Sequence, residues 1–373
     1  MSTPNELLEE YYSSSQKRKI KSFIASEDLR KKIEFICRCN ANKAPIRFLM
    51  SCLLAKIDKP SIDIRKPYTK IAGDDTFSGR DYDEGDIQPF VHKYGLPCNQ
   101  TTAYLTPGFR THNRLLTPDL VIEGKPPEVY KYSLEILDTV YNIKETPKNV
   151  LQEIIRFLII IKEENEVRMK QLIAELTQGD NALPLSSEEI VTLLSQHLNS
   201  KKASRLPTLI VAAAYTAVGE RIGEGSTPLE AHNAADKQTG SLGDVEITLV
   251  NDDKIITSYE MKDKRVTKDD IDVALIKLKK AKSKIDNYIF ITTDVIEDEV
   301  LEYAKSLYEK TAIEFAILDC IGFIRHYLHF FHRTRITFLN IYQELVLAEP
   351  TSSVSQPLKE VFLALRRAAE ADR

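Results

Sequence analysis

Two short runs of β-branched residues joined by a polar turn constrain the fold of this chain more than any other feature of its sequence. The runs are 245–250 and 255–259, and four polar residues, Asn-Asp-Asp-Lys, separate them. Such runs around an aspartate-rich turn are typical of a β-hairpin. A turn centred on Asp252 predicts the following facing pairs: Val250 with Lys254, Thr248 with Ile256, Glu246 with Ser258, and Asp244 with Glu260. The hairpin therefore places two carboxylates side by side.

The opposed residues Asp244 and Glu260 predict a metal site. Facing residues of an antiparallel pair have Cβ atoms about 5 Å apart, where like charges destabilise the sheet unless a cation neutralises them. Lys262 shares the face of Glu260 because strand side chains alternate. One or two Mg²⁺ ions held by the two carboxylates, with Lys262 at an attacking water, would suit hydrolysis of a phosphodiester. The alternative is that Glu260 and Lys262 are ordinary solvated strand residues.

The segments around the hairpin follow a recognisable order. A predicted helix, 206–221, carries Glu220 near its end, Thr267 can cap a helix that begins with acidic residues, and an apolar strand follows at 288–293. This order is similar to the core of PD-(D/E)xK nucleases over residues 205–295. The resemblance implies that an acidic residue of the first helix, Glu220 or Glu224, supports the metal site. Gly243 stands where the family often has proline, and no strand is evident between Glu220 and Asp244.

Four segments of the first half carry a second resemblance. They are Phe77-Ser-Gly-Arg-Asp-Tyr-Asp-Glu, Asp86-Ile-Gln-Pro-Phe, Tyr94-Gly-Leu-Pro and Leu105-Thr-Pro-Gly-Phe-Arg110. Placed ahead of a Gly-Asp-Val hairpin, they look like type II restriction endonucleases of the SacI family. The resemblance implies Mg²⁺-dependent, sequence-specific cleavage of double-stranded DNA by a homodimer.

Two groups of basic residues are candidate DNA contacts. Residues 60–127 are rich in Pro, Gly, Asp and Asn, which predicts loops, and loops on a scaffold often carry recognition. Arg80, Arg110 and Arg114 lie there, and arginine can make bidentate contacts with guanine. Lys264 and Arg265 belong to a strip, 262–284, in which nine basic residues accompany four aspartates, as phosphate binding requires. Base recognition by a loop such as 233–242 is the alternative.

The composition indicates the class of protein but does not indicate its activity. The chain has 373 residues, 43% hydrophobic and 28% charged, as expected for a globular enzyme. The net charge of −4 is not that of a nonspecific DNA binder. Five scattered cysteines without a CxxC pair suggest reduced thiols and a cytoplasmic protein, and the apolar runs are too short for a membrane span.

The expected fold is therefore α/β (α+β), with a mixed central sheet flanked by helices. Residues 1–200 are predicted to form a helical and loop-rich DNA-recognition domain, 201–346 the endonuclease domain, and 347–373 a link and a short helix. A helix with three histidines, 320–335, is interpreted as a basic surface rather than a zinc site. Two alternatives remain open: a structure-specific or repair nuclease, and a non-catalytic DNA-binding protein with a nuclease fold.

Overall fold

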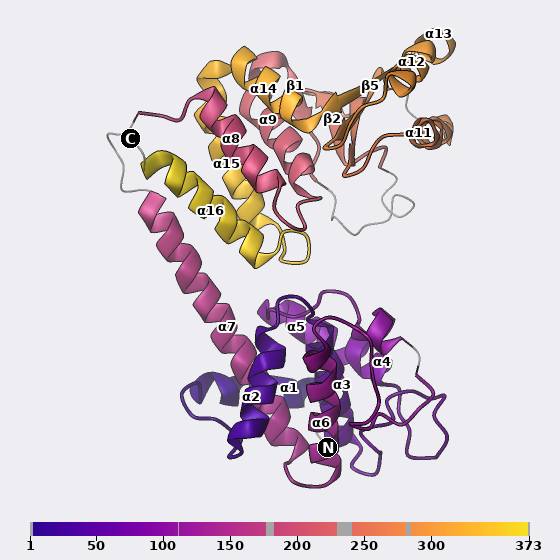
Figure 1. Ribbon diagram of the computed structural model, residues 1–373, viewed down its shortest axis with the longest axis vertical. Coiled ribbons are helices and arrows are strands. Elements are labelled where there is room, and N and C mark those ends of the chain that lie inside the picture. Colours follow the sequence, from indigo (N-terminus) through magenta and orange to yellow (C-terminus); the bar gives the residue numbers. More distant parts are fainter. Residues whose placement is uncertain (1–2, 111, 177–182, 230–240, 281–284, 372–373) are drawn as a thin grey trace. The chain divides into compact units, whose positions relative to one another are not determined.

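The computed structural model describes residues 3–110, 112–176, 183–229, 241–280 and 285–371. The chain forms two compact units, residues 1–168 and 169–373 (Figure 1). The helix α7 (Pro147–Leu176) contains the division between them. No described helix is long and apolar enough to cross a membrane.

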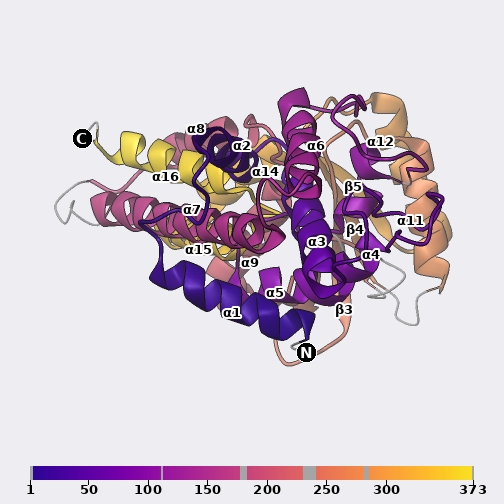
Figure 2. The same ribbon diagram turned by 90° about the horizontal axis from the view of Figure 1, so that it is seen from below.

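The first unit is helical around a central buried helix. Its other helices, besides α7, are α1 (Pro4–Lys17), α2 (Glu27–Arg38), α4 (Gly79–Tyr82), α5 (Gln88–Tyr94) and α6 (Pro127–Tyr141). The central helix α3 (Ala44–Asp58) is buried from Ala44 to Ala55, because apolar residues occupy every side of it. Helices α2, α4 and α6 pack against α3 (Figure 2). The helical character predicted for this part of the chain is thus confirmed.

The second unit contains a mixed sheet, as predicted. Its described strands are β1 (Glu224–Ser226), β2 (Val245–Leu249), β3 (Ile255–Lys262), β4 (Asn287–Thr292) and β5 (Glu314–Asp319), in the spatial order β1-β2-β3-β4-β5. The pairs β1–β2 and β2–β3 are antiparallel, whereas β3–β4 and β4–β5 are parallel. The expectation of no strand between Glu220 and Asp244 was wrong, because β1 lies there. Three residues, one of them glycine, are too few to show a strand periodicity.

Helices cover both faces of this sheet (Figure 1). One face carries Val245, Tyr259 and Ile291, which share a core with α8 (Ser187–Leu198), α9 (Leu206–Ile222), α14 (Cys320–Phe330), α15 (Arg335–Ala348) and α16 (Gln356–Ala371). The other face carries Tyr288 and Phe290, which pack with α11 (Lys268–Lys280), α12 (Asp298–Ser306) and the residues before the short α13 (Tyr308–Thr311). Because side chains alternate along a strand, Glu260 and Lys262 belong to the α11 face.

Helix α8 belongs to the second compact unit. It begins with a capping box, in which Ser186 and Glu189 satisfy each other's backbone N–H groups. It then packs against α14 and α16. The structural division therefore falls at Arg168 and Met169, whereas the sequence placed the start of the endonuclease domain near Lys201.

Candidate active site

The two predicted carboxylates adjoin the open end of the paired hairpin. Val245 pairs with Tyr259 and Glu246 with Ser258, so Asp244 immediately precedes the first paired residue of β2 and Glu260 immediately follows Tyr259 on β3. Near the turn the prediction was wrong by one residue, because Thr248 pairs with Ile255. A bulge at Ile256 on β3 absorbs this difference before the strands reach the carboxylates. The predicted pair of Glu246 with Ser258 is thus confirmed.

Asp244 is tied to the backbone of β3 at two points. Its amide nitrogen donates to the carbonyl oxygen of Tyr259 at 2.7 Å, and its Oδ2 accepts from the amide of Met261 at 2.7 Å. The preceding Gly243 makes this approach sterically feasible. A Cβ on Gly243 would lie 2.4 Å from both Ser258 Oγ and the Tyr259 carbonyl oxygen. Alanine or proline at this position would therefore push β2 away from β3.

Glu260 meets partners from two other elements. The buried hydroxyl of Tyr288 on β4 lies 3.2 Å from Glu260 Oε2 and 3.0 Å from the carbonyl oxygen of Leu242, to either of which it can donate. Lys277 on α11 approaches Glu260 Oε2 at 4.0 Å, and Lys262 Nζ lies 3.5 Å from Oε1. Glu260 is 23% exposed, so its carboxylate remains open to solvent.

Lys262 lies between two carboxylates, one of which the sequence interpretation missed as a site residue. Its Nζ is 3.2 Å from Asp270 Oδ1, closer than it is to Glu260. Burial alone would lower the pKa of Lys262, but the charges of Glu260 and Asp270 outweigh it and raise the pKa. The lysine is therefore an ammonium ion. Asp270 was interpreted only as favourable charge at the start of a helix, because its distance from Lys262 depends on how α11 packs.

Asp270 is itself held by the predicted cap of α11. Its Oδ2 accepts from the amide of Thr267 at 2.9 Å and from Thr267 Oγ1 at 2.7 Å, while Thr267 Oγ1 accepts from the amide of Asp270 at 3.3 Å. Burial would raise the pKa of Asp270, but these hydrogen bonds together with Lys262 lower it. The cap leaves Oδ1 directed at the lysine.

The structure does not bring Glu220 or Glu224 to this pair. Glu220 is exposed at the end of α9, where the neighbouring Gly219 abuts the Glu224 carbonyl. Glu224 pairs with Leu249, which is five residues along β2 from Asp244, or roughly 17 Å of strand. Residues 233–240 of the alternative recognition loop lie outside the described residues.

The donor set fits a hard divalent cation. Among the described residues, no group of three or more His, Cys, Asp and Glu is arranged to hold a metal ion. Two carboxylates are sufficient for Mg²⁺, which usually takes one or two protein carboxylates and completes its shell with water and substrate phosphate. Asp244 and Glu260 offer oxygen ligands only, which is the preference of Mg²⁺.

The predicted DNA contacts occupy both units. Lys264 is exposed after β3, and Arg265 forms an ion pair with Glu297, while residues 281–284 of the basic strip lie outside the described residues. In the first unit, Arg110 and Arg114 are exposed, and Arg80 is half-exposed beside Glu84 at 2.7 Å.

Arg80 and Arg110 flank one aromatic cluster of the first unit. Gly79 abuts the hydroxyl of Tyr104, and Tyr68 donates to the carbonyl oxygen of Phe109 at 2.8 Å. The rings of Tyr68 and Tyr104 lie 5.7 Å apart. The two arginines therefore project from segments that the same rings hold in place.

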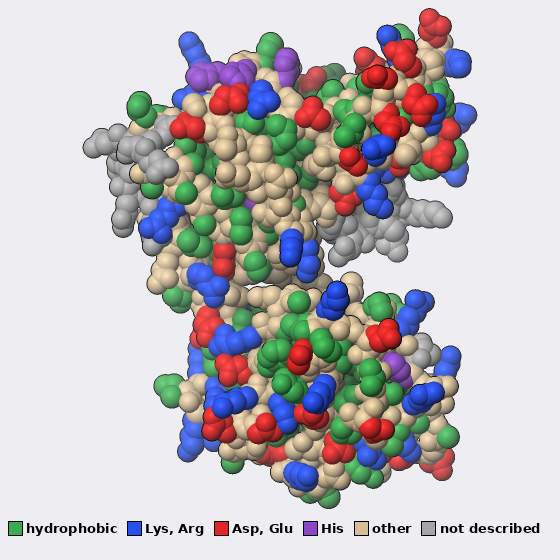
Figure 3. Space-filling model, viewed as in Figure 1, with side chains coloured by type: hydrophobic (Ala, Val, Ile, Leu, Met, Phe, Trp, Pro, Cys, Tyr) green, Lys and Arg blue, Asp and Glu red, His purple; other side chains and the backbone are tan. Residues whose placement is uncertain are grey.

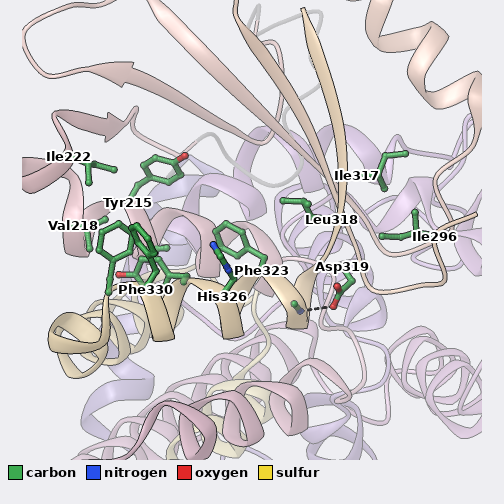
Figure 4. A pocket seen from close by; sticks show the side chains of 14 residues that line it. Tyr215, Val218, Ile222, Ile296, Ile317, Leu318, Asp319, Phe323, His326 and Phe330 are labelled. Atoms are coloured by element: carbon green, nitrogen blue, oxygen red, sulfur yellow. Dashed lines mark hydrogen bonds between the residues drawn. The ribbon is translucent and has the colours of Figure 1, made fainter. Parts of the chain in front are cut away.

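An apolar cavity of about 480 Å³ lies elsewhere in the second unit, between α9, α14 and the end of β5 (Figure 4). Ile222, Leu318 and Phe330 are among its apolar walls, and neither Asp244 nor Glu260 lines it. Two of its polar groups are engaged within the fold. Tyr215 is hydrogen-bonded to the Tyr259 hydroxyl at 2.9 Å, and Asp319 accepts from the Gly322 amide at 2.5 Å.

The predicted basic surface of α14 has an acidic partner. Histidines gather on one face of the second unit (Figure 3), and α14 contributes His326 and His329. Glu188 on α8 contacts His329 Nε2 at 2.8 Å and Arg325 Nε at 3.2 Å. Part of the positive charge on this helix is therefore neutralised within the unit.

A family comparison covers the elements that build the candidate site. Residues 183–293 match the family described as SacI restriction endonuclease C-terminal domain. The match runs from just before α8 to just after β4 and so includes Asp244, Glu260, Lys262 and Asp270. No curated protein matches the chain. The resemblance seen in the sequence is confirmed for this region, which is similar to the C-terminal domain of SacI restriction endonucleases.

Proposed function

We propose that this protein is a Mg²⁺-dependent type II restriction endonuclease that hydrolyses double-stranded DNA at specific sequences. One observation supports the proposal: Asp244 and Glu260 adjoin the pair Val245–Tyr259 at the open end of the hairpin, with Lys262 on the face of Glu260, inside a region that matches a restriction endonuclease domain. A structural ion pair would not require two acids to face each other at the open end of a hairpin. The cytoplasm, where foreign DNA is met and thiols stay reduced, suits an enzyme whose five cysteines are free.

Each site residue has a distinct task in this proposal. Asp244 and Glu260 hold Mg²⁺, which supplies electrostatic activation of water and of the scissile phosphate when it is bound. The Lys262 ammonium, kept charged by its two carboxylates, orients the phosphate and offsets negative charge that develops on it. Lys264 and Arg265 contact the DNA backbone next to the site. Glu220 stays a proposed supporting carboxylate. For it to reach Asp244 and Glu260, the end of α9 would have to move when DNA binds.

Base recognition is assigned to the first unit. Arg80 in the short helix α4 and Arg110 and Arg114 in loops are exposed cations, and arginine is the side chain that most often recognises guanine. With one catalytic site per chain, cutting both strands at symmetric positions requires two copies related by a twofold axis. We therefore propose a homodimer on a palindromic site.

The proposal is tested by incubating the purified protein with Mg²⁺ and a plasmid of mixed sequence. Discrete fragments support site-specific cleavage, a smear indicates a less specific repair-type nuclease, and an intact plasmid indicates a DNA-binding protein without chemistry. Asp244→Ala and Glu260→Ala are expected to abolish cleavage, because each removes a metal ligand, while DNA binding in Ca²⁺ stays near wild type. Asp253→Ala, in the exposed turn of the same hairpin, is the matched control and should cleave normally.

A further inference from the structure

Lys262 has two carboxylate partners with different freedom to move. Glu260 lies 3.5 Å from its Nζ and is also a ligand for Mg²⁺ in the proposed function, on which this inference rests. Asp270 lies closer, at 3.2 Å, and its other oxygen is bound twice by Thr267. Of the two, Asp270 is the one whose position does not depend on the metal.

The segment that carries Asp270 is firmly mounted on the sheet. Val266 and Ile271 are buried, at 3% and 0% exposure, on either side of the cap. Thr292 Oγ1 on β4 donates to the carbonyl oxygen of Lys264 at 2.8 Å, which holds the connection between β3 and α11. The start of α11 therefore keeps a fixed position beside the end of β3.

A divalent ion on Glu260 changes the balance between these two partners. A cation held there would repel the ammonium and would compete for Glu260 Oε1, which lies 3.5 Å from Lys262 Nζ. Without another anchor, the flexible lysine would leave the site for solvent. We propose that Asp270 is a positioning residue that retains Lys262 at the reacting phosphate when Glu260 is engaged by the metal, and that draws Lys262 off Glu260 so that the metal can bind.

The test uses Asp270→Asn, which keeps an oxygen for the Thr267 cap and removes the charge that faces Lys262. Its matched control is Asp269→Asn, which removes the same charge one residue away, on an exposed side chain. The rate of cleavage by enzyme saturated with DNA should fall on the order of tenfold in Asp270→Asn and stay near wild type in Asp269→Asn. Partial recovery by Asp270→Glu supports a charge-based role, and equal rates in the two asparagine variants overturn the proposal.

A double-mutant cycle separates positioning from simple support of the fold. If Asp270 acts through Lys262, adding Asp270→Asn to Lys262→Met should cause no further loss of rate. If Asp270 only stabilises the start of α11, the two losses multiply, and the proposal fails. Thermal unfolding of all variants shows whether any loss of rate follows a loss of structure.

Calorimetric titration with Mn²⁺, without DNA, gives a readout that is independent of cleavage. Asp270→Asn should weaken Mn²⁺ binding several-fold more than Asp269→Asn, because Lys262 is then left to Glu260 alone. In the Lys262→Met background this difference should disappear. Its persistence there would overturn the role of Asp270, whereas a wild type that binds Mn²⁺ in this pattern yet cleaves no DNA would overturn only the proposed function.

Discussion

At the scale of single residues, the site depends on a hydroxyl that the sequence pattern did not single out. Tyr288 belongs to a strand predicted from its apolar character, and its ring is 1% exposed between Phe290 and Phe315. Its hydroxyl, however, reaches both Glu260 and the carbonyl of Leu242, two residues before Asp244. The same residue therefore serves the core through its ring and the carboxylates through its oxygen.

Replacing Tyr288 with phenylalanine is expected to separate these two roles. The ring packing stays, so the free energy of unfolding should fall by only about 1 kcal/mol. Cleavage should slow on the order of tenfold because Glu260 loses a partner that orients it. Tyr303→Phe removes a hydroxyl of the same unit that contacts Asp272 instead, and it should cleave like wild type. Equal cleavage rates in both variants would remove Tyr288 from the site.

At the scale of elements, the close approach of β2 to β3 requires glycine at position 243. A Cβ there meets a backbone oxygen at 2.4 Å, and backbone within a sheet cannot yield as a flexible side chain can. The two strands carry the two carboxylates, so any displacement of β2 also displaces Asp244. The absence of a Cβ at Gly243 thus lets β2 approach β3 closely, and this approach sets the position of the Asp244 carboxylate.

Gly243→Ala should therefore reduce cleavage by at least tenfold while the protein still unfolds cooperatively. Gly225→Ala, in β1 of the same sheet, is the control, because a Cβ at Gly225 meets nothing within 4 Å. Cleavage assays together with urea unfolding distinguish a displaced carboxylate from a lost fold. Wild-type cleavage by Gly243→Ala would contradict the packing described for this hairpin.

A second element-scale feature is the buried His197 of α8, which joins α8 to α15 and α16. Its Nε2 donates to the carbonyl oxygen of Leu358 at 3.0 Å, which leaves Nδ1 to accept from the Tyr342 hydroxyl at 2.9 Å. Burial lowers the pKa of His197 to about 4, although the bond to Leu358 acts in the opposite direction. The unfolded chain, with an ordinary histidine pKa of about 6.5, binds the proton more readily.

Stability should consequently fall as the pH drops from about 6.5 towards 4, since the unfolded state takes up more protons in this window. Between pH 7 and pH 5 the contribution of His197 is about 2 kcal/mol. Urea unfolding of wild type and His197→Gln at the two pH values measures it, because glutamine can keep both hydrogen bonds without titrating. On acidification from pH 7 to pH 5, the free energy of unfolding of His197→Gln should fall by about that much less than that of wild type. An identical pH dependence in both proteins would refute the lowered pKa of His197.

At the scale of the whole molecule, we propose that the first compact unit recognises DNA bases and that the second hydrolyses the phosphodiester. The first unit carries the exposed arginines around an aromatic cluster, and the second carries the carboxylates and the basic segment after β3. The net charge of −4 means that DNA affinity must come from local basic groups rather than from the overall charge. Such local contacts can be removed one at a time.

Arg80→Ala and Arg110→Ala are expected to reduce the preference for specific over random DNA. The difference between the two binding free energies should shrink by about 1 to 3 kcal/mol per lost base contact. Loss of the exposed pair between Arg80 and Glu84 should have little effect on stability. Lys264→Ala, by contrast, should weaken binding to every sequence and flatten its salt dependence. Binding at two salt concentrations, on protein sized in solution, measures both effects. Unchanged specificity in both arginine variants would assign base recognition to other residues.

Local pattern was sufficient to predict the hairpin, its pair of Glu246 with Ser258, and the cap at Thr267. These features depend on residues close together in the chain, where alternation and turn composition act directly. The predicted pairing near the turn was wrong by one residue, but the bulge on β3 restores the predicted register at the pair of Glu246 with Ser258.

Tertiary structure alone decided the remaining parts of the site. The edge strand β1, the contact of Asp270 with Lys262 and that of Tyr288 with Glu260 join segments separated in the chain by whole strands and helices. The hydrophobic periodicity of a segment does not specify which helix packs on which face of a sheet. That arrangement depends on burying apolar surface over the entire unit. The sequence by itself thus indicated the groups proposed to carry the chemistry, and packing determined which neighbours hold them in place.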